Sequence, residues 1–170
     1  MQHFPESIPS AHHQCLGAQL TQHFHMFYHL NEGRIDLPMQ GRIDRTMNVL
    51  ATPDGSGATY IISRDELRAG ESLLQFAERQ LADLAGQVKS YQIVLAPTPL
   101  EPMTGVSAAL EFAGAFTQND QGILQRQAAL QIADSRRVLI VTMSGFEPFD
   151  DEAIKAWSLV VRSFQLRDTR

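Results

Sequence analysis

The sequence predicts an α+β domain in which an antiparallel sheet of about six strands packs with two helices. Three observations predict this class. Alternating and β-rich runs recur with short turns between them, two longer stretches carry apolar residues at helical spacing, and there is no internal repeat. The chain has 170 residues, of which 44 % are hydrophobic and 19 % are charged. This size and composition are typical of one folded domain.

Residues 1–25 differ from the rest of the chain. They carry no Lys or Arg, are rich in His and Gln, and have no periodic apolar pattern, so we expect a disordered leader. Met26 is a candidate biological start, and a single domain is expected over residues 26–168. All six histidines lie within the first 29 residues, but no acid or cysteine stands at ligand spacing from them. We therefore expect no metal site.

The first part of the domain consists of extended segments. Residues 28–37 are expected to form an extended entry segment that ends at Pro38. Residues 46–51 alternate and stop at the turn 53–57, and the β-rich run 58–63 follows. Two such runs with a turn between them predict a β-hairpin.

A helix is expected after residue 71. Its apolar residues recur at spacings of three and four, which predicts one buried stripe. The stripe consists of Leu73, Phe76, Ala77, Leu81, Leu84 and Val88. Glu71 at the start of the helix suits the helix dipole. A short strand over 91–95 is expected next, ended by the proline-rich segment 97–102, because proline cannot donate to a strand ladder.

The last third predicts an antiparallel meander followed by a helix. Residues 106–113 alternate, the turn 119–122 leads into 123–132, and a second turn leads into 138–143. Asp150 is expected to cap the final helix. The inner face of that helix is expected to consist of Ile154, Trp157, Val161 and Phe164.

Charge and motifs argue against several classes of protein. A net charge of −5 with 14 scattered basic residues argues against nucleic-acid binding. No apolar run approaches the roughly 18 residues of a membrane span. The single cysteine, Cys15, allows neither an internal disulfide nor a cysteine-based zinc site, and no nucleophile motif or phosphate-binding loop is present. We therefore expect a cytoplasmic binding protein without a cofactor, and not an enzyme.

Glutamines stand at two unusual places in the predicted elements. Gln80 lies within the apolar stripe of the first helix, where it either points to water at the margin or needs a partner inside. Gln125 and Gln127 share one face of the strand 123–132. That face is either the solvent side of a half-exposed sheet or, beside the apolar strand 138–143, a surface of apolar groups and amides for an apolar guest. The pattern alone favours the solvent side.

A series of short motifs resembles the DcrB-related family. The motifs are I-D-L-P (35–38), D-R-T-M-N-V-L (44–50), Y-I-I-S-R-D (60–65), F-A-E-R-Q-L (76–81), I-L-Q-R-Q-A (123–128) and L-I-V-T-M (139–143). They cover about residues 26–166 in order, and within the family they are most similar to the Eag chaperones of type VI secretion. The resemblance implies a Mog1/PsbP-like α/β sandwich that forms a homodimer. It also implies an apolar cradle that holds the N-terminal transmembrane helices of a secreted effector until the effector is loaded on the secretion spike.

The resemblance also implies contact residues and partners. By position, the contacts of the cradle fall on Met47 and Val49, which would supply apolar contact, and on Gln80 and Gln127, which would supply amide hydrogen bonds. The implied partners are the transmembrane segments of a cognate effector and, through it, the spike protein. The alternative is an envelope-associated binding domain of the wider family, which needs a signal peptide or a lipidated cysteine. Cys15 follows no apolar run, so we expect the chaperone.

Overall fold

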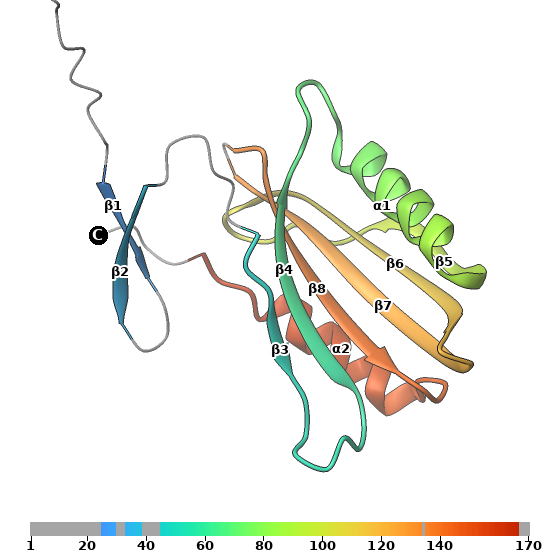
Figure 1. The fold of residues 1–170 in the computed structure, drawn as a ribbon. Coiled ribbons are helices and arrows are strands. Elements are labelled where there is room, and N and C mark those ends of the chain that lie inside the picture. Colours follow the sequence, from blue (N-terminus) through green and yellow to red (C-terminus); the bar gives the residue numbers. More distant parts are fainter. Residues whose placement is uncertain (1–24, 30–32, 39–44, 134, 167–170) are drawn as a thin grey trace, which may run out of the picture. The chain divides into compact units, whose positions relative to one another are not determined.

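The structure is a computed structural model that describes residues 25–29, 33–38, 45–133 and 135–166 (Figure 1). It divides into two compact units, Met1–Arg42 and Ile43–Arg170. In the first unit, β1 (His25–His29) pairs antiparallel with β2 (Arg34–Pro38). The sequence predicted one extended segment here, and the structure has two paired strands instead. The predicted leader lies outside the described residues, apart from His25 at its end.

The second unit contains a six-stranded sheet and two helices, in which every pair of neighbouring strands is antiparallel. The order in the sheet is β3-β4-β8-β7-β6-β5. In chain order, the elements are β3 (Asn48–Leu50), β4 (Thr59–Glu66), α1 (Leu73–Gln87), β5 (Lys89–Pro99), β6 (Val106–Gln118), β7 (Gln121–Ile132), β8 (Arg137–Gly145) and α2 (Asp151–Arg162). The predicted α+β class, with an antiparallel sheet of about six strands, is confirmed.

The two helices cover opposite faces of the sheet. Alternate residues of a strand point to opposite sides, so the helix that each residue contacts shows which face that helix covers. Leu110 and Phe112 of β6 pack with the buried residues of α1. Ala109, from the other side of the same strand, packs with Trp157 and Val161 of α2. Figure 1 shows the two helices flanking the sheet. Among the described residues, neither helix is long and apolar enough to cross a membrane.

The predicted meander is confirmed, and its first turn is tight. Asn119 and Asp120 have φ angles of 51° and 61°, and they join β6 to β7 directly. Two residues with positive φ form the turn that matches the right-handed twist of a hairpin, and Asn and Asp tolerate that conformation. β8 then returns beside β7 and also pairs with β4, which joins the meander to the first hairpin of the sheet.

β5 is longer than the sequence predicted. It was expected to end before Pro97, but it continues to Pro99 and pairs with β6 over most of its length. β5 is an edge strand, and its pairing with β6 shifts register at three places. Proline is tolerated at such positions, because an edge strand has a side that needs no donors and a bulge leaves residues unpaired.

The caps explain where the helices begin. α1 begins after Ser72, whose hydroxyl accepts from Gln75 N (3.2 Å) while Ser72 N donates to Gln75 Oε1 (2.9 Å). Glu71 therefore precedes the cap, and the predicted dipole role in the first turn is wrong. Its carboxylate accepts instead from Arg79 Nε (2.7 Å) and Arg68 N (2.7 Å). Asp150 caps α2 as predicted, by accepting from Ala153 N at 2.8 Å.

The predicted inner face of α2 is confirmed in part. Trp157 and Val161 are buried, and Ile154 is half-buried. Phe164 lies beyond the end of the helix, yet it packs against the same cluster.

Gly114 of β6 allows a close approach by Tyr91. A Cβ at this position would lie 2.5 Å from Tyr91 Oη and 2.9 Å from two carbons of its ring, which stacks on Phe116. We expect Gly114→Ala to lower the free energy of unfolding by about 1–3 kcal/mol, because the ring must leave its packed position. Gly122→Ala is the matched control, since a Cβ there meets nothing within 4 Å, and we expect a change within about 0.5 kcal/mol. Urea unfolding measures the free energy of unfolding of both variants, and an equal loss in the two variants would contradict the steric argument.

The ion pair beside the α1 cap predicts a pH dependence. Hydrogen bonds from Arg79, and then from the backbone of Arg68, lower the pKa of Glu71 from 4.5 to about 2. A carboxyl group with a lowered folded-state pKa stabilises the fold fully above its ordinary value and loses that effect as the pH falls. We expect stability to decline between pH 4.5 and about 2, and Glu71→Gln to flatten that part of the curve. Unfolding curves across this range test it, and parallel curves for the two proteins would refute it.

Candidate functional site

The sheet face below α1 is only partly covered. α1 packs mainly against β5, β6 and β7, at one edge of the sheet. The part of this face that α1 covers therefore decreases from β7 toward β8, β4 and β3. One cross-strand row shows this, and it runs from Phe112 through Gln127, Thr142 and Ile61 to Val49. Phe112 is 1 % exposed and Val49 is 61 % exposed, so one end of the row lies in the core and the other end is open.

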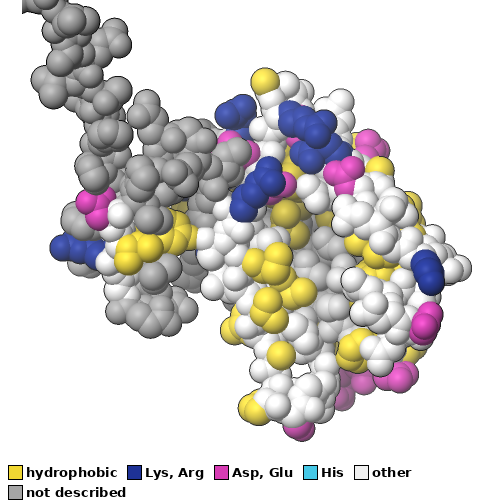
Figure 2. All heavy atoms as spheres, viewed as in Figure 1, with side chains coloured by type: hydrophobic (Ala, Val, Ile, Leu, Met, Phe, Trp, Pro, Cys, Tyr) yellow, Lys and Arg dark blue, Asp and Glu magenta, His cyan; other side chains and the backbone are white. Residues whose placement is uncertain are grey.

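A groove of about 260 Å³ lies where α1 meets this row. The helix supplies Gln80, Leu81, Asp83, Leu84 and Gln87. The sheet supplies Ile61, Ser63, Phe112, Gln125, Gln127, Ile140 and Thr142, and Met47 lies just before β3. Figure 2 shows hydrophobic side chains gathered over β3 and β4 on this face. The groove therefore has an apolar floor with amide and hydroxyl groups set into it.

The predicted contact residues come together at this groove. Met47, Gln80 and Gln127 line it. Val49 lies beside them, because it pairs with Ile61, which also lines the groove. These four residues come from α1, β7 and the β3 region, which are distant in the sequence. The fold thus forms a single surface from positions that the sequence could only name separately.

The glutamines are neither free on the surface nor fully buried. Gln80 is half-buried, and its Nε2 donates to Asp65 Oδ2 at 3.3 Å. Gln127 is also half-buried, and its Nε2 is bonded to Gln125 Oε1 at 3.1 Å. The two alternatives for this side of β7 both stay open, because these amides are partly exposed and also line a groove beside α1. Of the two alternatives for Gln80, the one that requires a partner describes the structure.

The groove is acidic and rich in hydrogen-bond acceptors. Its lining includes the carboxylate of Asp83 but no Lys, Arg or His. Asp65 stands behind Gln80, with its nearest cation, Arg45, at 3.7 Å and largely exposed. Among the described residues, no three His, Cys, Asp or Glu side chains are grouped so that they could hold a metal ion. The groove thus offers apolar contact and hydrogen bonds to a bound segment.

Sequence reasoning missed three polar residues of this site, namely Asp83, Gln87 and Asp65. Asp83 and Gln87 follow Gln80 at spacings of three and seven, which places all three on one side of a helix. That spacing could have identified them. Asp65 carries no such signal, because its contact with Gln80 depends on how α1 crosses the sheet.

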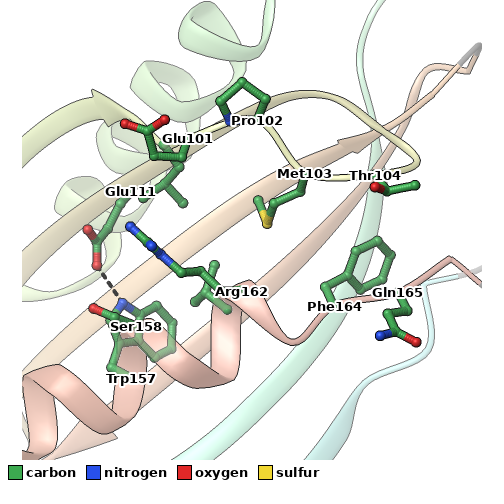
Figure 3. A pocket seen from close by; sticks show the side chains of 12 residues that line it. Glu101, Pro102, Met103, Thr104, Glu111, Trp157, Ser158, Arg162, Phe164 and Gln165 are labelled. Atoms are coloured by element: carbon green, nitrogen blue, oxygen red, sulfur yellow. Dashed lines mark hydrogen bonds between the residues drawn. The ribbon is translucent and has the colours of Figure 1, made fainter.

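A second cavity, of about 500 Å³, lies on the other face of the sheet beside α2 (Figure 3). Glu111 Oε1 accepts there from Trp157 Nε1 and from Arg126 Nε, the latter at 2.6 Å. Trp157 is buried, so these bonds tie α2 to β6 and β7. Glu111 is thus already engaged in holding the helix, and the α1 groove, where the predicted contact residues meet, is the better candidate for a partner site.

Comparisons with known proteins agree with the fold. The structure is similar to the crystal structure of PA94 from Pseudomonas aeruginosa, a protein of unknown function described as a candidate regulator. The two are 21 % identical with a TM-score of 0.67, over 85 % of this chain and 99 % of that chain. LpqN of Mycobacterium tuberculosis, involved in cell envelope biogenesis, is 14 % identical with a TM-score of 0.40, over 70 % and 80 % of the two chains. No curated protein matches the chain.

The family model named DcrB matches residues 32–163. This range includes β2, the whole six-stranded sheet and both helices. The predicted resemblance is confirmed at the level of the family, and the closer similarity to Eag chaperones stays a prediction. Because the match spans more than half of the sequence, the chain belongs to the DcrB family.

Proposed function

We propose that this protein is a cytoplasmic chaperone and adaptor that binds the N-terminal transmembrane helices of a type VI secretion effector and helps to load the effector on the secretion spike. One observation carries the proposal. Met47, Gln80 and Gln127, three of the contact positions that the family resemblance implies, line the same groove, with Val49 at its open side. The protein would act by binding and would catalyse no reaction.

The open apolar side chains supply a reason to bind. Met47 and Val49 are each 61 % exposed, and they stand before and along β3 on the side of the groove. A transmembrane helix of about 20 apolar residues likewise cannot stay dispersed in water. Covering about 1,000 Å² of such a helix is worth roughly 25 kcal/mol before the cost of association is subtracted. The two apolar surfaces can thus cover each other.

The size of the groove indicates how a guest would lie. About 260 Å³ accommodates side chains and not a whole helix. The body of the guest helix would therefore lie along the open face of β4 and β3, with some of its side chains in the groove. One copy of the chain covers one side of such a guest. A second copy would cover the other side, and we propose a homodimer as the working form.

The half-buried amides suit this guest. A helix satisfies most of its own backbone groups, but its first N–H groups remain without partners inside the helix. Gln80 and Gln127 line the groove, and amide carbonyls can accept such bonds. The guest would be held by apolar contact and positioned by a few hydrogen bonds.

The proposal predicts solubilisation of an effector fragment. The chain is co-expressed with a fragment that bears the N-terminal transmembrane helices of a type VI effector, and the soluble fraction of the fragment is measured. We expect the wild type to keep the fragment soluble. Gln80→Ala with Gln127→Ala should lower the soluble fraction several-fold, since two hydrogen bonds contribute about 1–3 kcal/mol.

A charge in the open apolar surface gives a sharper comparison. Val49→Asp places a carboxylate where the guest would lie, and we expect it to abolish rescue. Leu74→Asp is the matched control, because Leu74 is exposed on α1 and does not line the groove. No rescue by the wild type, or equal loss in both variants, would refute the proposal. Light scattering of the complex tests the homodimer.

A further inference from the structure

Asp65 fixes the orientation of the Gln80 amide. Gln80 Nε2 donates to Asp65 Oδ2 at 3.3 Å. An ionised carboxylate can only accept, so the NH₂ end of the amide must face Asp65. The carbonyl end, Oε1, is then turned away from Asp65. Within the described part of the chain, no hydrogen bond reaches this oxygen, and Gln80 lines the groove.

Asp65 is itself held in place. Its Oδ1 accepts from Glu66 N at 2.8 Å and lies 3.7 Å from Arg45 Nη2. It belongs to β4, an inner strand of the sheet, where it stands opposite the buried Val138. The acceptor orientation of Gln80 is therefore imposed by the sheet and does not depend on a flexible surface contact.

The remaining polar groups of the groove add to the same bias. Asp83 contributes a carboxylate, and none of the lining residues is Lys, Arg or His. Gln125 and Gln127 bond to each other and can present one acceptor and one NH₂ group between them. Ser63, Thr142 and Gln87 can both donate and accept, so the bias of the groove comes from the Gln80 carbonyl and from the negative charge of Asp83.

We propose that the groove selects apolar segments that present hydrogen-bond donors or a positive charge, and that Asp65 sets this selectivity through Gln80. A serine or threonine hydroxyl, a lysine ammonium group or a free N–H of a first helical turn fits the groove. A carboxylate fits less well, because it would face the charge of Asp83 and would meet an acceptor, not a donor, at Gln80 Oε1. This selectivity rests on the proposed function, since it concerns the same guest and the same groove.

The substitution Asp65→Asn tests the role of Asp65 directly. Asparagine has nearly the same shape as aspartate but carries an NH₂ group. That group can donate to Gln80 Oε1, which allows the Gln80 amide to turn over and present its own NH₂ to the groove. Asp151→Asn is the matched control, because it removes the same charge from the exposed first turn of α2.

The probe is a soluble carrier protein fused to a leucine–alanine helix of about 20 residues with one variable central position. The central residue is Ala, Ser, Lys or Asp, and each guest is co-expressed with the full chain. The soluble guest that copurifies is measured relative to the same guest without the chain. We expect the Ala guest to be captured, and the Ser and Lys guests to exceed the Asp guest by roughly three- to tenfold, the range that one hydrogen bond provides.

The variants complete the test. Asp65→Asn should narrow the difference between the Lys and Asp guests while it still captures the Ala guest, and Asp151→Asn should retain the full difference. Part of the difference should remain, because Asp83 still lines the groove. Gln80→Leu should narrow the difference too, and this variant keeps the test decisive if urea unfolding shows that Asp65→Asn does not fold. Capture of the Ala guest with equal capture of Ser, Lys and Asp would overturn the selectivity and leave the proposed function standing. A difference of undiminished size in both variants would overturn the role of Asp65, and no capture of any guest would overturn both proposals.

Discussion

The architecture depends on the need to cover both faces of one antiparallel sheet. α2 covers its face with Trp157 and Val161, and the bonds from Trp157 and Arg126 to Glu111 hold it there. α1 is placed toward β5, β6 and β7, so the other face is covered at one edge and open at the opposite edge. Every feature of the candidate site follows from this offset. A more central α1 would bury the row that ends at Val49 and leave no groove.

The offset also explains why amides stand where they do. At the covered end of the row, Phe112 needs only apolar neighbours, and at the open end Val49 meets solvent. Gln127 lies between these ends, where a polar side chain can be half-buried without losing its hydrogen bonds, and the buried Thr142 lies next to it in the row. Gln80 stands above the same zone, and its NH₂ group donates to Asp65. Polar groups in this zone are therefore compatible with stability and also available to a partner.

The sequence predicted most of the fold, because its signals are local. Alternation, turn residues and caps identified the meander, the first hairpin of the sheet and the Asp150 cap. β5 was predicted too short, because whether proline breaks a strand depends on whether that strand lies at an edge, which is a property of the whole sheet. Glu71 was assigned to the dipole because the capping box of Ser72 and Gln75 was overlooked. The four contact positions came from resemblance, and only their glutamines stood out in the pattern. Asp65 was out of reach, since its contact with Gln80 joins residues 15 apart through the crossing of a helix over a sheet.

A site of this kind works best if its walls are already in place when a partner arrives, because ordering them on binding would weaken the association. Both the helix α1 and the strands that form the floor of the groove meet that condition. Ser72, Gln75 and the pair of Glu71 with Arg79 fix the start of α1, and Phe76 and Ala77 anchor its buried side. The floor consists of inner strands that pair on both sides. PA94 has the same fold at 21 % identity, so the fold alone does not define a partner. What can distinguish one member of the DcrB family from another is the small set of side chains that the offset of α1 leaves half-covered, and here that set is apolar, amide-bearing and acidic.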